Sequence, residues 1–201
     1  FGTLTFVGGA VAITENSATT LAGTNTATSL ALTSAGAIDD GAAATLAVTG
    51  LANFQAGANA ITLDNAASHN FGTLTFVGGA VAITENSATT LAGTNTANSL
   101  VLTAAGSITQ TGAVTVTTTS QLEVTAATSD ILLHTQANDF GGTISFAGTQ
   151  TNIRDLGLRN TNVGATVPTL SGLTNLRDLT LIFNGTGITL PSFTASGNAL
   201  V

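Results

Sequence analysis

Polar side chains that could do chemistry are few, and the most suggestive of them recur at a fixed spacing. The run Asn152-Ile153-Arg154-Asp155-Leu156 returns 23 residues later as Asn175-Leu176-Arg177-Asp178-Leu179. Clustered arginines and carboxylates on one face are what an enzyme needs to bind a uronate and move a proton. In a repeat, the same residues could instead pair diagonally across neighbouring turns, which contributes at most about 1 kcal/mol per surface pair. We favour this structural role for Arg154, Asp155, Arg177 and Asp178.

The other ionisable residues form no recognisable catalytic or metal site. Asp39 and Asp40 are adjacent and have no acidic counterparts 70 residues later, so we expect a solvated turn there. His69 and His134 lack a second histidine or carboxylate at ligand spacing, which predicts surface or turn histidines. The chain has no cysteine, which excludes disulfides and thiolate sites. We therefore expect no catalytic residue, no metal and no cofactor.

Composition excludes two classes of partner. The net charge is -7, with three arginines and no lysine, so the chain cannot supply the cationic surface that nucleic acids require. No stretch approaches 18 consecutive apolar residues, so no membrane-spanning helix is expected. Because 43% of the residues are hydrophobic and only 6% are charged, the chain should fold with an unusually uncharged surface.

The sequence repeats itself at long range. Residues 1–27 recur without a change at 71–97, a period of 70. A third copy begins one residue early, since Asp139-Phe140-Gly141 corresponds to Asn70-Phe71-Gly72. We therefore treat 1–201 as a single segment whose internal repeats are 1–70, 71–139 and 140–201.

Local patterns predict short strands. Apolar residues alternate with small polar ones, as in Leu4/Phe6 and Val11/Ile13, and turn formers separate these pieces. Because three spacings of 23 nearly equal the 70-residue period, we predict an all-β parallel β-solenoid with turns of about 23 residues and three turns per long unit. In such a column Asn152, Asn175 and Asn198 would stack into a ladder of amides.

Two alternatives concern other surfaces or shapes. Regular threonine pairs could form a flat face that binds ice or a crystalline polysaccharide, although threonine also simply favours strands. The pairs are Thr3 with Thr5, Thr24 with Thr26, Thr73 with Thr75, Thr94 with Thr96 and Thr115 with Thr117, of which Thr3, Thr5, Thr73 and Thr75 are the candidate face. Separately, the leucines from Leu173 to Leu181, with Asn184 following, fit a leucine-rich repeat and would predict a horseshoe. Thr161 stands where the preceding copy of that pattern would need its asparagine.

Three phrases carry a resemblance to a known family. They are LTAAGSITQTGAVTV (102–116), HTQANDFGGTISF (134–146) and TNLRDLTLIFNG (174–185). They resemble the repeat regions of filamentous-haemagglutinin-type exoproteins, the secreted adhesins of bacterial two-partner secretion. The resemblance implies a right-handed parallel β-helix, export, and an adhesive role in a large protein at the cell surface or released from it.

Repetition itself favours a function that scales with length. A catalytic centre is needed once, whereas a stalk or adhesive shaft gains reach or valency from every added copy. We therefore expect a structural and adhesive segment that is not an enzyme. Its expected partners are flanking repeats or identical subunits stacked end to end into filaments, with host or environmental glycans as candidate ligands.

Overall fold

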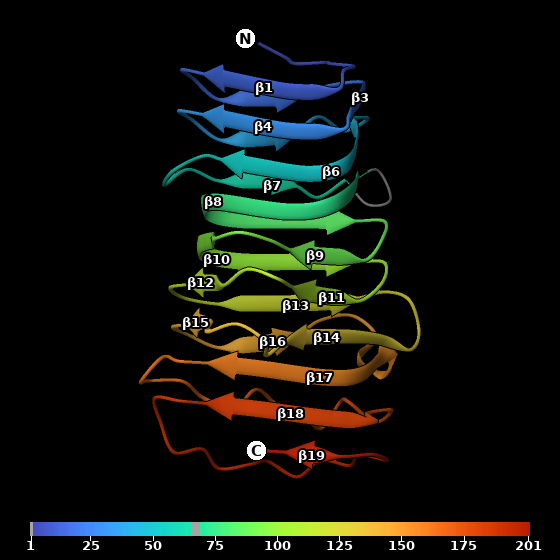
Figure 1. The fold of residues 1–201 in the computed structure, drawn as a ribbon, viewed down its shortest axis with the longest axis vertical. Coiled ribbons are helices and arrows are strands. Elements are labelled where there is room, and N and C mark those ends of the chain that lie inside the picture. The colour runs from blue at the N-terminus through green and yellow to red at the C-terminus, as the bar shows by residue number, and fades with distance from the viewer. Residues whose placement is uncertain (1, 66–68) are drawn as a thin grey trace.

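The computed structural model describes residues 2–65 and 69–201, and it shows a column of parallel strands (Figure 1). This confirms the all-β solenoid. The described residues form 19 strands and one short 3-10 helix, η1 (Gln150–Asn152). The strands are β1 (Ala10–Glu15), β2 (Thr19–Leu21), β3 (Thr24–Ala27), β4 (Ser29–Ser34), β5 (Ile38–Asp40), β6 (Thr45–Gln55), β7 (Ile61–Leu63), β8 (His69–Glu85), β9 (Thr89–Leu91), β10 (Asn95–Ala104), β11 (Ile108–Gln110), β12 (Val114–Val116), β13 (Ser120–Val124), β14 (Ser129–Leu133), β15 (Asp139–Phe140), β16 (Ile144–Phe146), β17 (Ile153–Asn160), β18 (Asp178–Phe183) and β19 (Ala199–Leu200).

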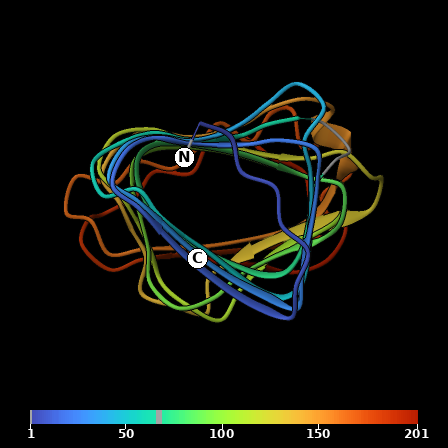
Figure 2. The ribbon, with the colours of Figure 1, turned by 90° about the horizontal axis from the view of Figure 1, so that it is seen from above.

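The chain winds through about nine turns, each stacked on the one before. Seen from above, successive turns follow one closed outline (Figure 2). In the N-terminal half the pairings define three sides, β1–β4–β6–β8, β2–β5–β7–β8 and β3–β6–β8; the long strands β6 and β8 bend around corners and belong to more than one side. At the usual spacing of neighbouring strands, nine turns give a column on the order of 40 Å long.

Turn length varies more than the sequence suggested. Paired residues lie 23 apart between β17 and β18, but 19 apart between β1 and β4 and 24 to 25 apart between β14 and β17. The average is roughly 21, so the predicted 23 is too long. Corner segments of unequal length cause the variation, because the strands that they connect stay in register.

The 70-residue repeat is consequently not three turns long. Three turns from Val11 lead through Leu30 and Ala52 to Leu74, which is seven residues short of Val81. Val81 lies instead on another side, where it pairs with β7. Identical sequences in the two copies therefore occupy different sides of the column, and the prediction of three turns per unit is wrong.

The core is a single stack of inward-facing apolar side chains. Burial alternates along the strands, with Phe54, Phe76 and Phe140 among the largest fully buried side chains. Threonine and serine alternate with these residues and face outward or into corners. The leucines of the horseshoe alternative, including Leu173 and Leu181, are buried at the C-terminal end of this same column, so the horseshoe is not formed.

Candidate functional site

An outer ladder of charges crosses three successive turns near the C-terminal end. Arg154 donates from Nε and Nη2 to the Asp130 carboxylate of the preceding turn, at 3.0 and 2.6 Å. Arg177 likewise donates from Nε to Asp155 at 2.9 Å, and its Nε lies 3.0 Å from Asp178. The hydrogen bond to Asp155 raises the pKa of the Arg177 guanidinium. We call these five residues the Arg–Asp ladder.

In the Arg–Asp ladder each guanidinium is already held by carboxylates. The structure brings together all four residues singled out in the sequence and adds Asp130, which the 23-residue pattern did not reveal. Arg154 and Arg177 are 39% and 49% exposed, so solvent screens these pairs and their contribution to stability is small. The arrangement joins neighbouring turns to each other.

Asn152 and Asn175 of the expected amide ladder keep the 23-residue spacing at which β17 pairs with β18, but their printed hydrogen bonds go to main-chain carbonyls of the preceding turn. Asn152 donates from Nδ2 to Val124 O and Thr125 O, and Asn175 donates from Nδ2 to Thr151 O at 2.9 Å. Asn198 instead meets Asp178, whose Oδ1 accepts its backbone N–H at 2.8 Å. The reason is a local change of register, because β19 pairs with β18 at a spacing of 20 residues.

The threonine pairs also lie on separate sides. Leu4, between Thr3 and Thr5, pairs with Leu21, whereas the strand that carries Thr73 and Thr75 pairs with β6. Thr5 and Thr75 each donate the hydroxyl hydrogen bond to a carbonyl of the following turn, at 2.6 and 2.7 Å. In the second copy Thr75 pairs with Asn53, and Asn53 in turn pairs with Ala31. The neighbouring turns therefore carry no threonine at this position, and these residues form no continuous threonine array.

Four buried asparagines, which sequence reasoning missed, tie successive turns together. In each asparagine, Oδ1 accepts a hydrogen bond from a backbone N–H of an earlier turn, at 2.9 to 3.2 Å. All four asparagines are 0% exposed. The pairs are Asn25 with Phe6, Asn95 with Phe76, Asn138 with Val114, and Asn160 with Phe140. The alternation of the strands could have predicted them, because Asn25 and Asn95 occupy positions whose side chains face inward.

A buried acid–imidazole pair corrects two predictions. His69 is fully buried and its Nε2 lies 2.7 Å from Oδ2 of Asp40, whose side chain is 1% exposed. Asp40 is therefore not in a solvated turn and His69 is not a surface residue. In the next repeat the corresponding positions hold Gln110 and Asn138, whose amides exchange two hydrogen bonds of 2.9 Å. Corresponding positions of two repeats thus hold an ionisable pair in one repeat and a neutral amide pair in the next.

A second buried acid lies close to this pair. Glu85 is 2% exposed, and its carboxylate accepts hydrogen bonds from Phe71 N at 2.8 Å and from Thr89 Oγ1 at 2.5 Å. Burial raises the pKa of Glu85 to about 7, despite these hydrogen bonds.

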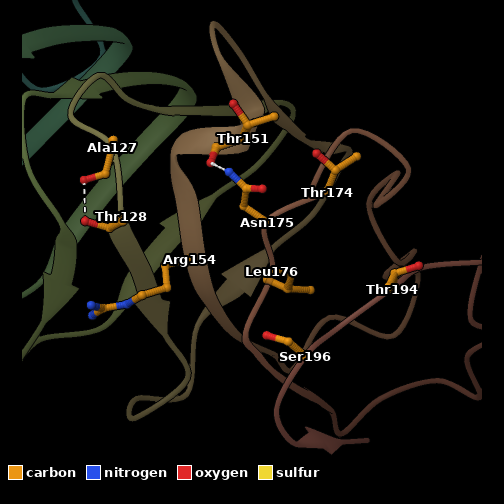
Figure 3. A pocket seen from close by; sticks show the side chains of 9 residues that line it. All are labelled: Ala127, Thr128, Thr151, Arg154, Thr174, Asn175, Leu176, Thr194 and Ser196. Atoms are coloured by element: carbon orange, nitrogen blue, oxygen red, sulfur yellow. Dashed lines mark hydrogen bonds between the residues drawn. The ribbon is translucent and has the colours of Figure 1, made fainter.

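A shallow groove of about 430 Å³ lies beside the Arg–Asp ladder. Figure 3 shows its lining, in which the amide of Asn175 points at Thr151 and the guanidinium of Arg154 extends away from Ser196. Thr128, on its rim, has a φ of 59°, which is uncommon for a β-branched residue. Most of the lining residues carry a hydroxyl or an amide, although the surface that they expose is more apolar than polar, and none of them is a nucleophile hydrogen-bonded to a base. Within residues 2–65 and 69–201 no three His, Asp or Glu side chains gather as a metal site.

Comparison with known proteins gives one match. A protein-family model described as "Repeats of unknown function (DUF5649)" matches residues 8–77 and 78–147, two consecutive units of the same 70-residue length found in the sequence. No curated protein and no solved structure matches the chain. In the part of the chain that the structure describes, no helix has the length and apolar character needed to cross a membrane.

Proposed function

The chain belongs to the DUF5649 repeat family, and we propose that it is a structural and adhesive shaft segment of a large secreted bacterial surface protein. The observation that carries this proposal is that successive repeat units continue a single column of stacked turns. Each turn offers its successor the same kind of edge, so an added unit lengthens the column without a new design. The likeness of three phrases to filamentous-haemagglutinin-type repeats supports export and adhesion.

Two further features support a shaft. The ionic contacts of the Arg–Asp ladder run between turns, and the buried asparagines do the same inside the column. Both sets resist separation of one turn from the next. End-to-end stacking of columns into filaments would use the same parallel edges.

Adding a unit tests the structural part. In a variant with residues 1–70 repeated once more before Phe71, every junction keeps the natural sequence, because Phe1 and Phe71 begin the same 27 residues. We expect the column to lengthen by about 16 Å in X-ray scattering, with unchanged β circular dichroism per residue. The control carries a scrambled unit of equal length at the same position. An extra unit as disordered as the scrambled one contradicts the shaft.

Location and adhesion need their own assays. Antibodies against the chain should label intact, unpermeabilised cells of the producing organism. Purified chain immobilised on beads should retain host cells or glycans, and the extended variant should retain more. Labelling only after permeabilisation contradicts a surface location, and equal retention by chain-free beads contradicts adhesion.

A further inference from the structure

Glu85 joins the two family units at a corner of the column. It ends β8, whose 17 residues run from His69 across the boundary between the matched segments 8–77 and 78–147. Oε1 accepts hydrogen bonds from Phe71 N at 2.8 Å and Ser87 Oγ at 3.3 Å, while Oε2 accepts one from Thr89 Oγ1 at 2.5 Å. One carboxyl group thus connects the end of the first unit to the beginning of the second.

The elements packed around this carboxyl supply no cation. The strands β6, β7, β9 and β10 contain no ionisable side chain. In β8 itself the other ionisable group is His69, which is bonded to Asp40 of β5, and Asp64 after β7 is exposed. A charge on Glu85 is therefore balanced only by hydrogen bonds from neutral donors.

Corresponding acids in the other repeats have different surroundings. Glu15, within the identical 27-residue segment, accepts hydrogen bonds from Asn16 N and Ser17 Oγ, both at 3.1 Å. Asp155, 70 residues after Glu85, pairs with Arg177. Glu85 contacts both Phe71 N and Thr89 Oγ1, and so joins segments that belong to different matched units.

Burial of this carboxyl favours its protonated form. Desolvation raises the pKa of Glu85 from 4.5 to about 7, although its hydrogen bonds act in the opposite direction. Once the corner opens, water can solvate the ionised group, so the open form releases its proton at lower pH. Between about pH 5 and pH 7 the closed form therefore binds more protons than the open form, and rising pH favours opening.

We propose that Glu85 is a pH-responsive latch between the two repeat units. When the carboxyl of Glu85 is protonated, its contacts with Phe71 and Thr89 are closed. Loss of that proton favours local opening of these contacts. The stability of the contact between the two repeat units at Glu85 therefore depends on pH. This proposal rests on the column of the proposed function and is independent of an adhesive role.

Amide exchange measured by NMR on the full chain tests the latch. The opening constant for Phe71 and Thr89, corrected for intrinsic exchange, should rise about tenfold per pH unit between roughly pH 5 and 7 and level off above that range. Glu85→Gln keeps an oxygen for Phe71 N and should remove this dependence. Glu15→Gln, made in the same local sequence, should leave it unchanged.

Three results would overturn the proposal. The first is a pH-independent opening constant in the natural chain, and the second is an unchanged dependence in Glu85→Gln. The third is loss of the dependence only when Asp40 and His69 are replaced by the Gln–Asn pair of the next repeat, which would place the effect in that pair. If Glu85→Gln does not fold, carbon NMR of the natural chain decides, because a Glu85 carboxyl titrating below pH 5 refutes the latch. Scattering at each pH separately reports whether the column itself is present.

Discussion

Replacing Asn95 by alanine tests whether buried asparagines hold the turns together. The substitution removes Asn95 Oδ1, which accepts the backbone N–H of Phe76 at 3.2 Å. Asn95 and Phe76 are both 0% exposed. The carbonyls that Asn95 Nδ2 contacts keep other donors, since Thr75 Oγ1 bonds Ala92 O and Asn95 N bonds Ala113 O. The main loss is therefore one buried N–H without a partner, which costs about 1 to 3 kcal/mol.

The first repeat supplies a matched control for this substitution. Asn25 has the same neighbours in sequence and accepts Phe6 N at 3.0 Å, but Phe6 is only partly buried. Water can reach that N–H after Asn25→Ala, so we expect a loss at the lower end of the same range. Urea unfolding of both variants measures the free energies, and amide exchange of Phe76 reports the local effect. Equal losses in the two variants would refute the reasoning from burial.

Three further sets of substitutions probe other contacts. Phe76→Ala should cost about 3 to 5 kcal/mol in urea unfolding and Phe6→Ala clearly less, because only the first empties a fully buried site; similar costs would contradict this. His69→Ala should cost about 3 to 5 kcal/mol by leaving Asp40 buried without its partner, whereas the double variant Asp40→Gln/His69→Asn should fold, and failure of the double variant to melt above the single one would contradict the shared site. Arg177→Ala should lower the free energy of unfolding only slightly, and less in high salt, because solvent screens the pair. A loss as large as that of His69→Ala, and not reduced by salt, would contradict a surface network.

Sequence reasoning succeeded where the determining pattern is local. Alternation such as Val11/Ile13 decides which face of a strand is inward, so the solenoid follows from residues close together in the chain. It failed where two distant residues must be paired. Asp40 and His69 lie 29 residues apart, and their contact depends on the lengths of the three connections between β5 and β8, which no local pattern encodes. The same dependence on corner length displaced Asn198 from the expected ladder.

The placement of identical repeats on different sides shows which unit builds the column. Each copy keeps its contacts with the turn that follows: Leu4 pairs with Leu21 as Leu74 pairs with Leu91. Val11 meets Leu30 in the same way that Val81 meets Leu100.

Contacts with a preceding turn can be followed for the second copy, where Val81 pairs with Ile61 of β7. This side differs from the one on which Val11 of β1 lies. The contacts that the two copies share are therefore those with the turn that follows. Because these contacts are kept while the side changes, the repeat need not contain a whole number of turns, and the turn is the unit whose geometry must be preserved.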